Sequence, residues 1–360
     1  MQLVFVTQVL DRGDAVLGFV ARWVEALSLE CEKVRVLALE VGDTSGLPPN
    51  VEAVELGRSG RVRRYLRYRR ALLGAFDSGF DGLLTHMVPR YSTLGARFAR
   101  RAKAPHFLWY THKGVDARLL TAIDAVDGVF TASEESLRVE TPKKIVTGHG
   151  IDAAHFDRER RPGPPGRVRL LSVGRLTPSK DPLTVIEAVD QLRRDGCDAT
   201  LTWAGGALGP GDEEYGALVA RSIEGRGLED AVSLRGAVPY PGVPALYQEA
   251  DIFVNASRTG SVDKVVLEAM AARLPFVTCN ESIPPLLKGT LSSAHIDEFV
   301  SFPAGDADAL ARRIAKHVDQ PQDERNQRAE ALHNYVCTVH NVDDLMARLV
   351  RHMQGHSLTR

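Results

Sequence analysis

The sequence predicts two α/β domains of similar size, each built around a mainly parallel β-sheet. The 360 residues are enough for about two domains of ordinary size. Short apolar runs alternate with amphipathic stretches along most of the chain, which is typical of strand–helix–strand units with parallel strands. Residues 157–166, rich in proline, glycine and charge, interrupt this alternation near the middle and indicate a linker.

The first domain is expected to span residues 1–155. Its strands are predicted from short apolar runs, at residues 3–7, 34–39, 51–56, 82–86, 106–110, 128–131 and 144–147. Its helices are predicted from amphipathic stretches, at residues 15–27, 61–76 and 93–102.

A linker over residues 156–167 should lead to a second domain over residues 168–330. Strands are predicted at residues 168–173, 200–204, 232–234, 252–255 and 276–279. A helix over residues 182–194 begins at Pro182, which suits a first turn. The tail, residues 331–360, is expected to be helical and to pack back toward the first domain. Two such domains facing each other would place the carboxyl ends of both sheets, where open α/β sheets bind ligands, around one cleft.

Composition excludes several classes of protein. A net charge of −1 argues against a nucleic-acid protein, which usually carries a large positive excess. The four cysteines are far apart, which indicates free thiols in a reducing compartment. The first apolar run is short and lacks a basic leader, and no run of about 18 apolar residues occurs. A cytoplasmic protein is therefore expected.

The segment 170–182 (LLSVGRLTPSKDP) is the first candidate for chemistry. A buried strand should end at Gly174, with Arg175 directly after it and Lys180 before the next helix. Cations between a strand's carboxyl end and a helix's amino end can hold a diphosphate. The alternative is that both are solvated loop cations, which contribute little.

The segment 256–272 (ASRTGSVDKVVLEAMAA) is the second candidate. A small polar turn leads into a helix whose amino end, near Asp263, Lys264 and Val265, should offer backbone N–H groups to a phosphate or a sugar. Glu268 lies one turn further along, among apolar residues. A carboxylate there needs donors, and a ribose diol supplies two. The alternative is an exposed helix glutamate.

These segments resemble the retaining glycosyltransferases of family four, which have the two-domain GT-B architecture. The resemblance rests on VGRL (173–176) with Lys180 and on LEAMA (267–271). Between them, WAGG (203–206), LRGAV (234–238) and ADIFVNAS (250–257) occur in the expected order. The likeness covers most of residues 165–320. In the first half it rests more loosely on FTAS (130–133) and GHGID (148–152).

The resemblance implies roles for five residues of the second domain. Arg175 and Lys180 match the pair that neutralises the donor diphosphate. Glu268 matches the carboxylate that holds the nucleotide ribose. Val238 matches the position whose backbone contacts the base, and Gly205 lies on the loop under the nucleotide.

The first domain is expected to present the acceptor. By resemblance, His112 reaches the transferred sugar and Gly13 lets the backbone approach the diphosphate. Asp14 is a candidate to position or deprotonate an acceptor hydroxyl, or it is only a helix cap. His86 ends a predicted strand and either lines the cleft or is structural.

One departure from the family concerns the donor sugar. The family usually has two glutamates separated by seven residues, and the second is Glu268. The first would be residue 260, which is Gly260 here. Asp263 is a candidate replacement, displaced by three residues along the turn.

A basic patch is the last feature, with seven arginines within residues 58–70. We expect Val62, Tyr65, Leu66 and Leu73 to form one stripe of a helix, and basic residues another. The patch residues are Arg61, Arg63, Arg64, Arg67 and Arg70. Such helices often bind anionic membranes. A solvated helix face is the alternative, and nucleic acid has no other support.

The predicted reaction moves a sugar from a UDP- or GDP-sugar to an acceptor hydroxyl of a glycan, a lipid-linked or a small-molecule acceptor, with retention implied by the resemblance. No cofactor or metal is expected. A sugar-nucleotide epimerase and a non-catalytic nucleotide-sugar-binding protein are the alternatives. A dehydrogenase is disfavoured because no G-x-G-x-x-G follows the first strand. The sequence does not name the base, sugar or acceptor.

Overall fold

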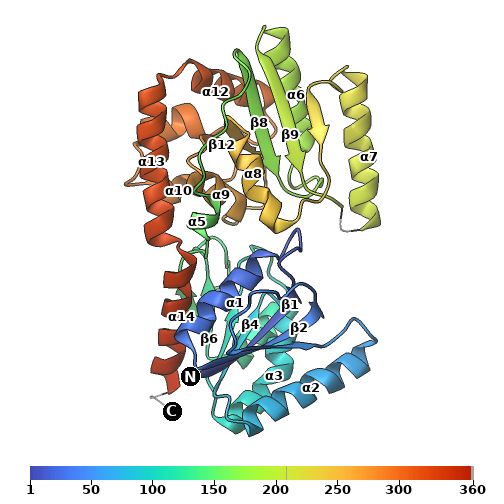
Figure 1. Cartoon of the computed structure of the whole chain (residues 1–360), viewed down its shortest axis with the longest axis vertical. Helices are drawn as coiled ribbons and strands as arrows, with labels where there is room; N and C mark the ends of the chain where they lie inside the picture. The colour runs from blue at the N-terminus through green and yellow to red at the C-terminus, as the bar shows by residue number, and fades with distance from the viewer. Residues whose placement is uncertain (208, 358–360) are drawn as a thin grey trace. The chain divides into compact units, whose positions relative to one another are not determined.

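The computed structural model describes residues 1–207 and 209–357, which form two compact units (Figure 1). The first unit contains Met1–Gly150, Pro239–Pro241 and the described part of His340–Arg360. The second contains Ile151–Val238 and Gly242–Val339. The units therefore divide at Gly150, five residues before the predicted boundary. The expected tail also divides, because residues 331–339 belong to the second unit.

The first unit is built on a seven-stranded sheet of order β3-β2-β1-β4-β5-β6-β7. Every neighbouring pair is parallel, as the alternating pattern predicts. The strands are β1 (Gln2–Leu10), β2 (Lys33–Val41), β3 (Val51–Glu55), β4 (Gly82–His86), β5 (His106–Trp109), β6 (Gly128–Thr131) and β7 (Lys144–Val146). The helices are α1 (Phe19–Glu30), α2 (Arg61–Asp77), α3 (Pro89–Ala102), α4 (Ala117–Ala125) and α14 (Val342–Ser357).

Helix α14 forms part of the core of the first unit, where it packs against α1. Leu345, Met346 and Leu349 are fully buried in the same cluster as Trp23 of α1 and Phe5 of β1. Burying each such side chain stabilises the fold by about 1.5–3 kcal/mol. The last helix of the chain thus contributes to the stability of the first unit.

The second unit is built on a five-stranded parallel sheet of order β10-β9-β8-β11-β12. The strands are β8 (Arg167–Val173), β9 (Asp198–Ala204), β10 (Val232–Leu234), β11 (Ile252–Asn255) and β12 (Phe276–Thr278). The longer helices are α6 (Pro182–Arg194), α7 (Pro210–Gly225), α9 (Lys264–Ala271), α12 (Ala307–Asp319) and α13 (Gln322–Val339). The short ones are α5 (Ala153–Phe156), α8 (Val243–Gln248), α10 (Pro284–Leu287), α11 (Ser293–His295) and the π-turn η2 (Ile296–Val300), whereas most of the turn η1 (Tyr240–Gly242) belongs to the first unit.

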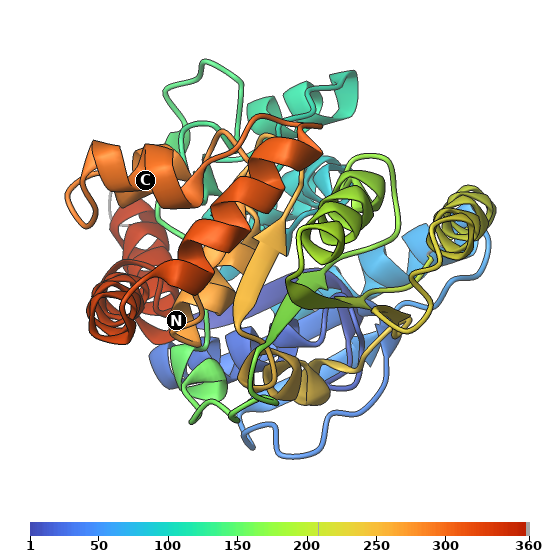
Figure 2. The same cartoon turned by 90° about the horizontal axis from the view of Figure 1, so that it is seen from above.

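Helices cover both faces of the second sheet. α6 and α12 lie side by side (Figure 2) and share one apolar cluster with residues of β8, β9 and β11. α9 packs instead against α5 and α13. Because helices cover the faces of the sheet, the loops and their polar side chains lie at the ends of the strands.

Three expectations about helices were wrong. α3 begins at Pro89 rather than at residue 93, with the proline in its first turn. α1 begins at Phe19 rather than residue 15, because the preceding residues form turns in which Gly18 N–H donates to Asp14 O (3.0 Å). In α2 the buried side chains are Tyr68, Leu72 and Ala75 rather than the predicted stripe. Val62 and Leu66 are instead 73% and 52% exposed. No helix in the described part of the chain is long and apolar enough to cross a membrane.

Candidate active site

The carboxyl ends of β8, β9 and β10 meet in a tight set of glycine-containing loops. Gly174 N–H donates to Ala204 O (2.8 Å), and Gly205 N–H donates to Gly236 O (2.8 Å). The indole of Trp203 donates to Gly174 O (2.8 Å). These bonds fix the loop that carries Arg175 against the loop that carries Gly205.

Gly205 is a position where the backbone requires glycine. Its φ is +147°, and a Cβ atom there would lie 2.0 Å from Gly174 O. A side chain would therefore push the two loops apart. Gly205 is predicted to let a nucleotide approach the backbone. The structure shows a different reason for the glycine, which is the close contact between the Gly205 and Gly174 backbones. Val238, the predicted base-contacting position, follows Gly236 at the end of the second unit's first segment.

The two predicted diphosphate cations lie on one loop after β8, and each has a carboxylate partner. Arg175 is about half exposed, and its Nη1 lies 3.2 Å from Oδ2 of Asp212, in the first turn of α7. Lys180 Nζ lies 2.7 Å from Oδ1 of Asp263 and donates to the Ser257 hydroxyl (3.1 Å). The Lys180 side chain is only 20% exposed. Lys180 is therefore not the simple solvated cation of the alternative interpretation, whereas Arg175 keeps a largely solvated side chain.

Asp263 is the centre of a polar cluster, which we call the Asp263 cluster (Lys180, Asn255, Ser257, Asp263 and Asn280). Its Oδ2 accepts from the side-chain amides of Asn280 (3.0 Å) and Asn255 (3.3 Å). Burial by itself raises the pKa of Asp263, but the charge of Lys180 and the donated hydrogen bonds outweigh it, so that the pKa lies below its usual value. Asp263 is therefore an ionised carboxylate fixed at the carboxyl edge of the sheet.

The cluster explains how the turn before α9 is organised. Gly260 has a φ of +64°, a backbone conformation that favours glycine. Asp263 occupies the cap position of α9 but makes no side-chain cap bond, because its carboxylate is directed to Lys180 and the two asparagines. Thr259 also donates to Asp263 (3.3 Å), so the acidic residue nearest to the position of the missing glutamate already has four side-chain partners.

Glu268 is buried in α9 (3% exposed), which excludes the exposed-glutamate alternative. Its Oε1 lies 3.0 Å from Nζ of Lys264, one turn earlier. The Tyr247 hydroxyl lies 3.1 Å from Oε2 of Glu268 and 3.1 Å from Val265 O, so its single proton is shared between these two acceptors. Desolvation lowers the pKa of Lys264, and the Glu268 carboxylate opposes this. A carboxylate has about four acceptor positions, so Glu268 retains capacity for further donors.

In the first unit, the predicted residues follow the ends of three neighbouring strands, β1, β4 and β5. Gly13 N–H donates to the Asp11 carboxylate (2.8 Å). One Asp14 oxygen accepts from the N–H groups of Val16 (2.9 Å) and Leu17 (2.5 Å). Asp14 thus holds the turn before α1, but it is not the helix cap of the alternative interpretation, because Gly18 occupies the cap position of α1.

The two predicted histidines of the first unit differ in environment. His112 is exposed, and its Nδ1 accepts from Gly114 N–H (2.9 Å), which leaves the proton of the neutral ring on Nε2. His86 is 3% exposed, with Nδ1 at 3.1 Å from the Thr7 hydroxyl. Aromatic rings of Phe5 and Trp23 surround it, at centroid distances of 6.0 and 5.3 Å. His86 is therefore packed as a core residue, which favours the structural alternative. His112 lies at the surface, where a ligand could reach it.

Several site residues escaped the sequence analysis. Asn280 is 2% exposed and follows β12, and its amide joins Asp263 to Ser261 O (2.8 Å). Asp212 and Tyr247 were missed as partners of Arg175 and Glu268. The only available signal was that Asn255 ends one strand and Asn280 closely follows another, and these two strands prove to be neighbours. In the described part of the chain, no group of three or more His, Cys, Asp or Glu side chains is arranged to hold a metal ion.

Two parallel-sheet, Rossmann-like units in one chain define the GT-B fold class. The sequence model of the glycosyl transferases group 1 matches residues 167–320, all of which except residues 239–241 lie in the second unit. This match confirms the predicted resemblance to that family of glycosyltransferases over the matched segment. The matched segment contains Arg175, Lys180, Asp263 and Glu268.

Similar proteins support this assignment. The chain is 32% identical over 183 residues to the putative colanic acid biosynthesis glycosyltransferase WcaL of Salmonella typhimurium, covering 49% of this chain and 42% of WcaL. It is 34% identical over 173 residues to the amylovoran biosynthesis glycosyltransferase AmsK of Erwinia amylovora, covering 46% and 40%. The chain thus matches less than half the length of either relative.

The fold is supported over the whole length by solved structures. Anabaena HepE, crystallised with UDP and glucose, superposes with a TM-score of 0.77 at 16% identity, covering 99% of this chain and 100% of HepE. This likeness confirms the predicted GT-B fold.

Proposed function

We propose that this chain is a retaining glycosyltransferase that transfers a sugar from a UDP- or GDP-sugar to an acceptor hydroxyl in the biosynthesis of a glycan or glycolipid. The observation that carries the proposal is the position of Lys180. Its ammonium group lies in the Asp263 cluster at the carboxyl edge of the second sheet, where open α/β sheets bind nucleotides.

The donor diphosphate would lie at the loop after β8. Arg175 is half exposed and its pair with Asp212 is solvated, so a diphosphate can displace that carboxylate at small cost. Lys180 would stay in contact with Asp263 and add a donor to the diphosphate, because an ammonium group has three N–H donors. Glu268 would accept from the ribose hydroxyls while Tyr247 and Lys264 hold its orientation.

The reaction breaks the bond between the anomeric carbon and the diphosphate oxygen, and forms a bond from the acceptor oxygen to the same carbon. The electron pair of the broken bond stays with the diphosphate, which takes up the acceptor's proton. Arg175 and Lys180 stabilise the charge that develops on the diphosphate, the largest demand of this step. Attack from the face that the diphosphate leaves gives retention and requires no protein nucleophile.

We propose that no metal or other cofactor takes part. Lys180, Arg175 and the first turn of α9 together supply the positive potential that a divalent ion provides in other transferases. Activity that persists in excess chelator supports this part of the proposal, and activity that depends on added Mg²⁺ or Mn²⁺ contradicts it.

We further propose that α2 brings the enzyme to the anionic inner face of a membrane, where a lipid-linked acceptor is available. Val62 and Leu66 lie one turn apart and are both exposed, next to the exposed side chains of Arg61, Arg63 and Arg67. Apolar side chains flanked by arginines favour an anionic lipid surface. Arg64 and Arg70 add to the same charge.

Product analysis tests the function directly. The protein is incubated with UDP- and GDP-sugars and a panel of glycan and lipid-linked acceptors, and the products are analysed by NMR. The proposal predicts a new glycosidic bond whose anomeric configuration equals that of the donor. A product of inverted configuration contradicts retention.

The absence of a glutamate at Gly260 favours one second candidate, a protein that binds a nucleotide sugar without transferring it. Binding without transfer or hydrolysis across the acceptor panel would support that candidate. Conversion of the donor without any acceptor would indicate an epimerase instead.

A further inference from the structure

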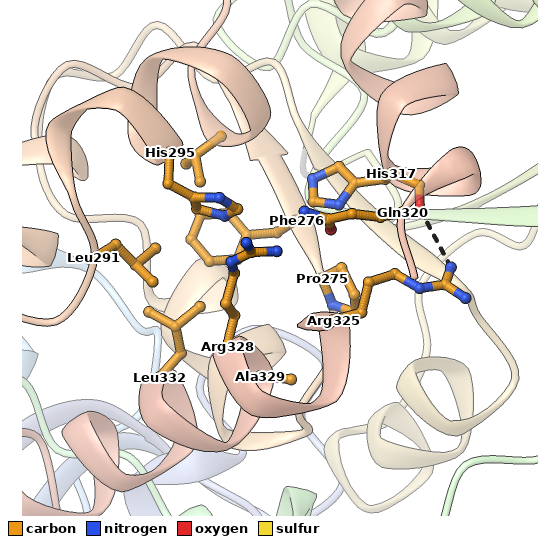
Figure 3. Close-up of a pocket in the computed structure, with 11 residues that line it drawn as sticks. Pro275, Phe276, Leu291, His295, His317, Gln320, Arg325, Arg328, Ala329 and Leu332 are labelled. Carbon is orange, nitrogen blue, oxygen red and sulfur yellow. Dashed lines mark hydrogen bonds between the residues drawn. The ribbon is translucent and has the colours of Figure 1, made fainter. Parts of the chain in front are cut away.

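Two hollows outside the candidate active site differ in what they can hold. The cavity in Figure 3 lies beside β12 and has a volume of about 30 Å³, with Pro275, Leu291 and Leu332 in its wall. One water requires about 10–15 Å³, so this cavity has room for two or three waters at most. A groove in the first unit is much larger, at about 410 Å³, which is within the range of ligand sites.

This groove, which we call the α2 groove, lies between helix α2 and β3, the edge strand of the first sheet. Arg67, Arg70, Ala71 and Gly74 form its wall on the α2 side. Arg67 and Ala71 are four positions apart, as are Arg70 and Gly74, so these residues lie along one side of the helix. A Cβ atom at Gly74 would meet nothing within 4 Å outside its own helix in the described residues. The small residues thus leave the space that the groove occupies.

The groove contains two guanidinium groups that no carboxylate neutralises within the described residues. Arg67 and Arg70 are both exposed, and Arg67 donates to a backbone carbonyl (3.1 Å). Arg35 also lines the groove but is already paired with Glu52 (2.8 Å). Glu55 is exposed and is the one acidic residue in the described lining. The two arginines outweigh this glutamate by a single charge, which favours a ligand with one negative charge.

The rest of the lining is apolar. Val54 and Ala71 are half-buried there, and the stems of the arginines add methylene surface. Val62 and Leu66, which carry the membrane proposal, are exposed on the same helix. The ligand should therefore combine an anion with an apolar part. A further β-strand is a poor occupant, because β3 is only five residues long and carries two glutamates, both typical of edges that avoid pairing.

We propose that the α2 groove binds the headgroup of an anionic phospholipid and commit to phosphatidylglycerol, an inference that rests on the proposed membrane binding of α2. The phosphodiester carries one negative charge near pH 7, and its oxygens accept from Arg67 and Arg70. A glycerol hydroxyl donates to Glu55, and the first carbons of the acyl chains lie against Val54 and Gly74. Phosphatidylcholine has no net charge and no headgroup hydroxyl, so it fits less well.

Calorimetric titration of the full-length protein with dihexanoyl phosphatidylglycerol, kept below the concentration at which it forms micelles, tests the groove. We expect saturable binding that is at least tenfold weaker in Arg70→Gln, which removes a charged donor, and in Gly74→Leu, which fills the groove. Leucine favours a helix more than glycine does, so Gly74→Leu should fold. Dihexanoyl phosphatidylcholine should bind wild type at least tenfold more weakly. Glycerol 3-phosphate, which lacks acyl chains, should show no binding that Arg70→Gln weakens.

Arg69→Gln is the matched control, because Arg69 is an exposed arginine beside Arg70 that does not line the groove. Its titration should equal that of wild type, and circular dichroism verifies that each variant is folded. Phosphate groups can also reach the candidate donor loop, so the groove variants localise the binding. The absence of saturable binding, or binding that Arg70→Gln and Gly74→Leu leave unchanged, overturns the proposal. Equal binding of phosphatidylcholine overturns it as well.

This titration is independent of the test of membrane binding, because the lipid is monomeric. Lipid binding without flotation on anionic vesicles would remove the membrane proposal and keep the groove. Flotation without binding of the monomeric lipid would keep membrane binding and overturn the groove.

Discussion

Lys180 and Asp263 form a largely buried ion pair with 2.7 Å between Nζ and Oδ1, and it joins the two sequence segments that carry the candidate site. Lys180 comes from the loop after β8, and Asp263 from the start of α9, 83 residues later. The pair determines where a donor diphosphate would meet positive charge. It also shows that Asp263 serves first to hold Lys180.

Replacing Asp263 with Asn should destabilise the protein by about 3 kcal/mol, because it leaves Lys180 without its counter-ion in a mostly buried position. Urea unfolding measures the change in the free energy of unfolding. Asp198→Asn, which weakens solvent-exposed pairs with Arg167 and Arg193, is the control and should cost less than about 1 kcal/mol.

The same pair predicts a pH dependence. The pKa of Asp263 is lowered in the folded protein, so its stabilising effect is present above the unfolded pKa of about 4 and is lost as pH falls through the lower folded value. The difference in unfolding free energy between wild type and Asp263→Asn should thus stay constant above about pH 5 and shrink in more acidic solution. A difference that grows on acidification contradicts the ion pair.

Replacing Gly205 with Ala should destabilise the second unit by more than about 2 kcal/mol. The new Cβ would lie 2.0 Å from Gly174 O, in a backbone conformation that side chains rarely adopt. Gly216→Ala is the control: this glycine lies inside α7, where a Cβ meets only Leu176 at 3.7 Å. It should stabilise the protein by up to about 1 kcal/mol. Thermal unfolding of both variants measures the contrast.

Glu268 is predicted to bind the ribose, which a comparison of ligands can isolate. Wild-type protein should bind UDP at least tenfold more tightly than a UDP analogue that lacks both ribose hydroxyls. Glu268→Gln should lose most of this preference, because an amide is a weaker acceptor than a carboxylate. Glu187→Gln, an exposed glutamate of α6, should keep it. An unchanged preference in Glu268→Gln removes the ribose assignment.

Membrane binding by α2 is tested by flotation with vesicles. The protein should float with vesicles containing anionic phospholipid and not with neutral ones. Replacing Val62 and Leu66 with Asp should abolish flotation without loss of stability, because both side chains are more than half exposed. Val339→Asp and Leu218→Asp are controls, since these exposed residues lie in the second unit. Equal binding to both vesicle types would contradict the proposal.

Most of the strands could be predicted from sequence because each is an apolar run bounded by loop residues. Gly82–His86, Gly128–Thr131, Val232–Leu234 and Ile252–Asn255 match the predicted bounds residue for residue, as does the helix Pro182–Arg194. Gly82–His86, Gly128–Thr131 and Ile252–Asn255 are buried at every residue, so local pattern and tertiary environment agree for these strands.

The buried face of α2 was mispredicted because the helix carries apolar residues on two different faces, and only one of them is buried. A stripe through Val62 and Leu66 has the right spacing, but the sheet contacts Tyr68, Leu72 and Ala75 instead. The choice depends on where neighbouring elements lie, which helical periodicity does not record. The exposed apolar residues that result are the ones on which the membrane proposal rests.

The segments of the candidate site could be recognised in the sequence, but the partners of their residues could not. Arg175, Lys180, Asp263 and Glu268 lie in recognisable segments. Asn280 holds Asp263 only because β12 pairs with β11, and pairing order is set by the whole sheet.

The most direct test of the account is calorimetric measurement of UDP, GDP and ADP binding to wild type, Arg175→Ala and Lys180→Ala. Lys288→Ala, an exposed lysine after α10, and Arg312→Ala serve as controls. We predict that wild type and both controls bind at least one of the three, and that Lys180→Ala and Arg175→Ala each weaken that binding at least tenfold. Unchanged nucleotide affinity in both variants, with the fold intact, would contradict the placement of the donor diphosphate at this loop.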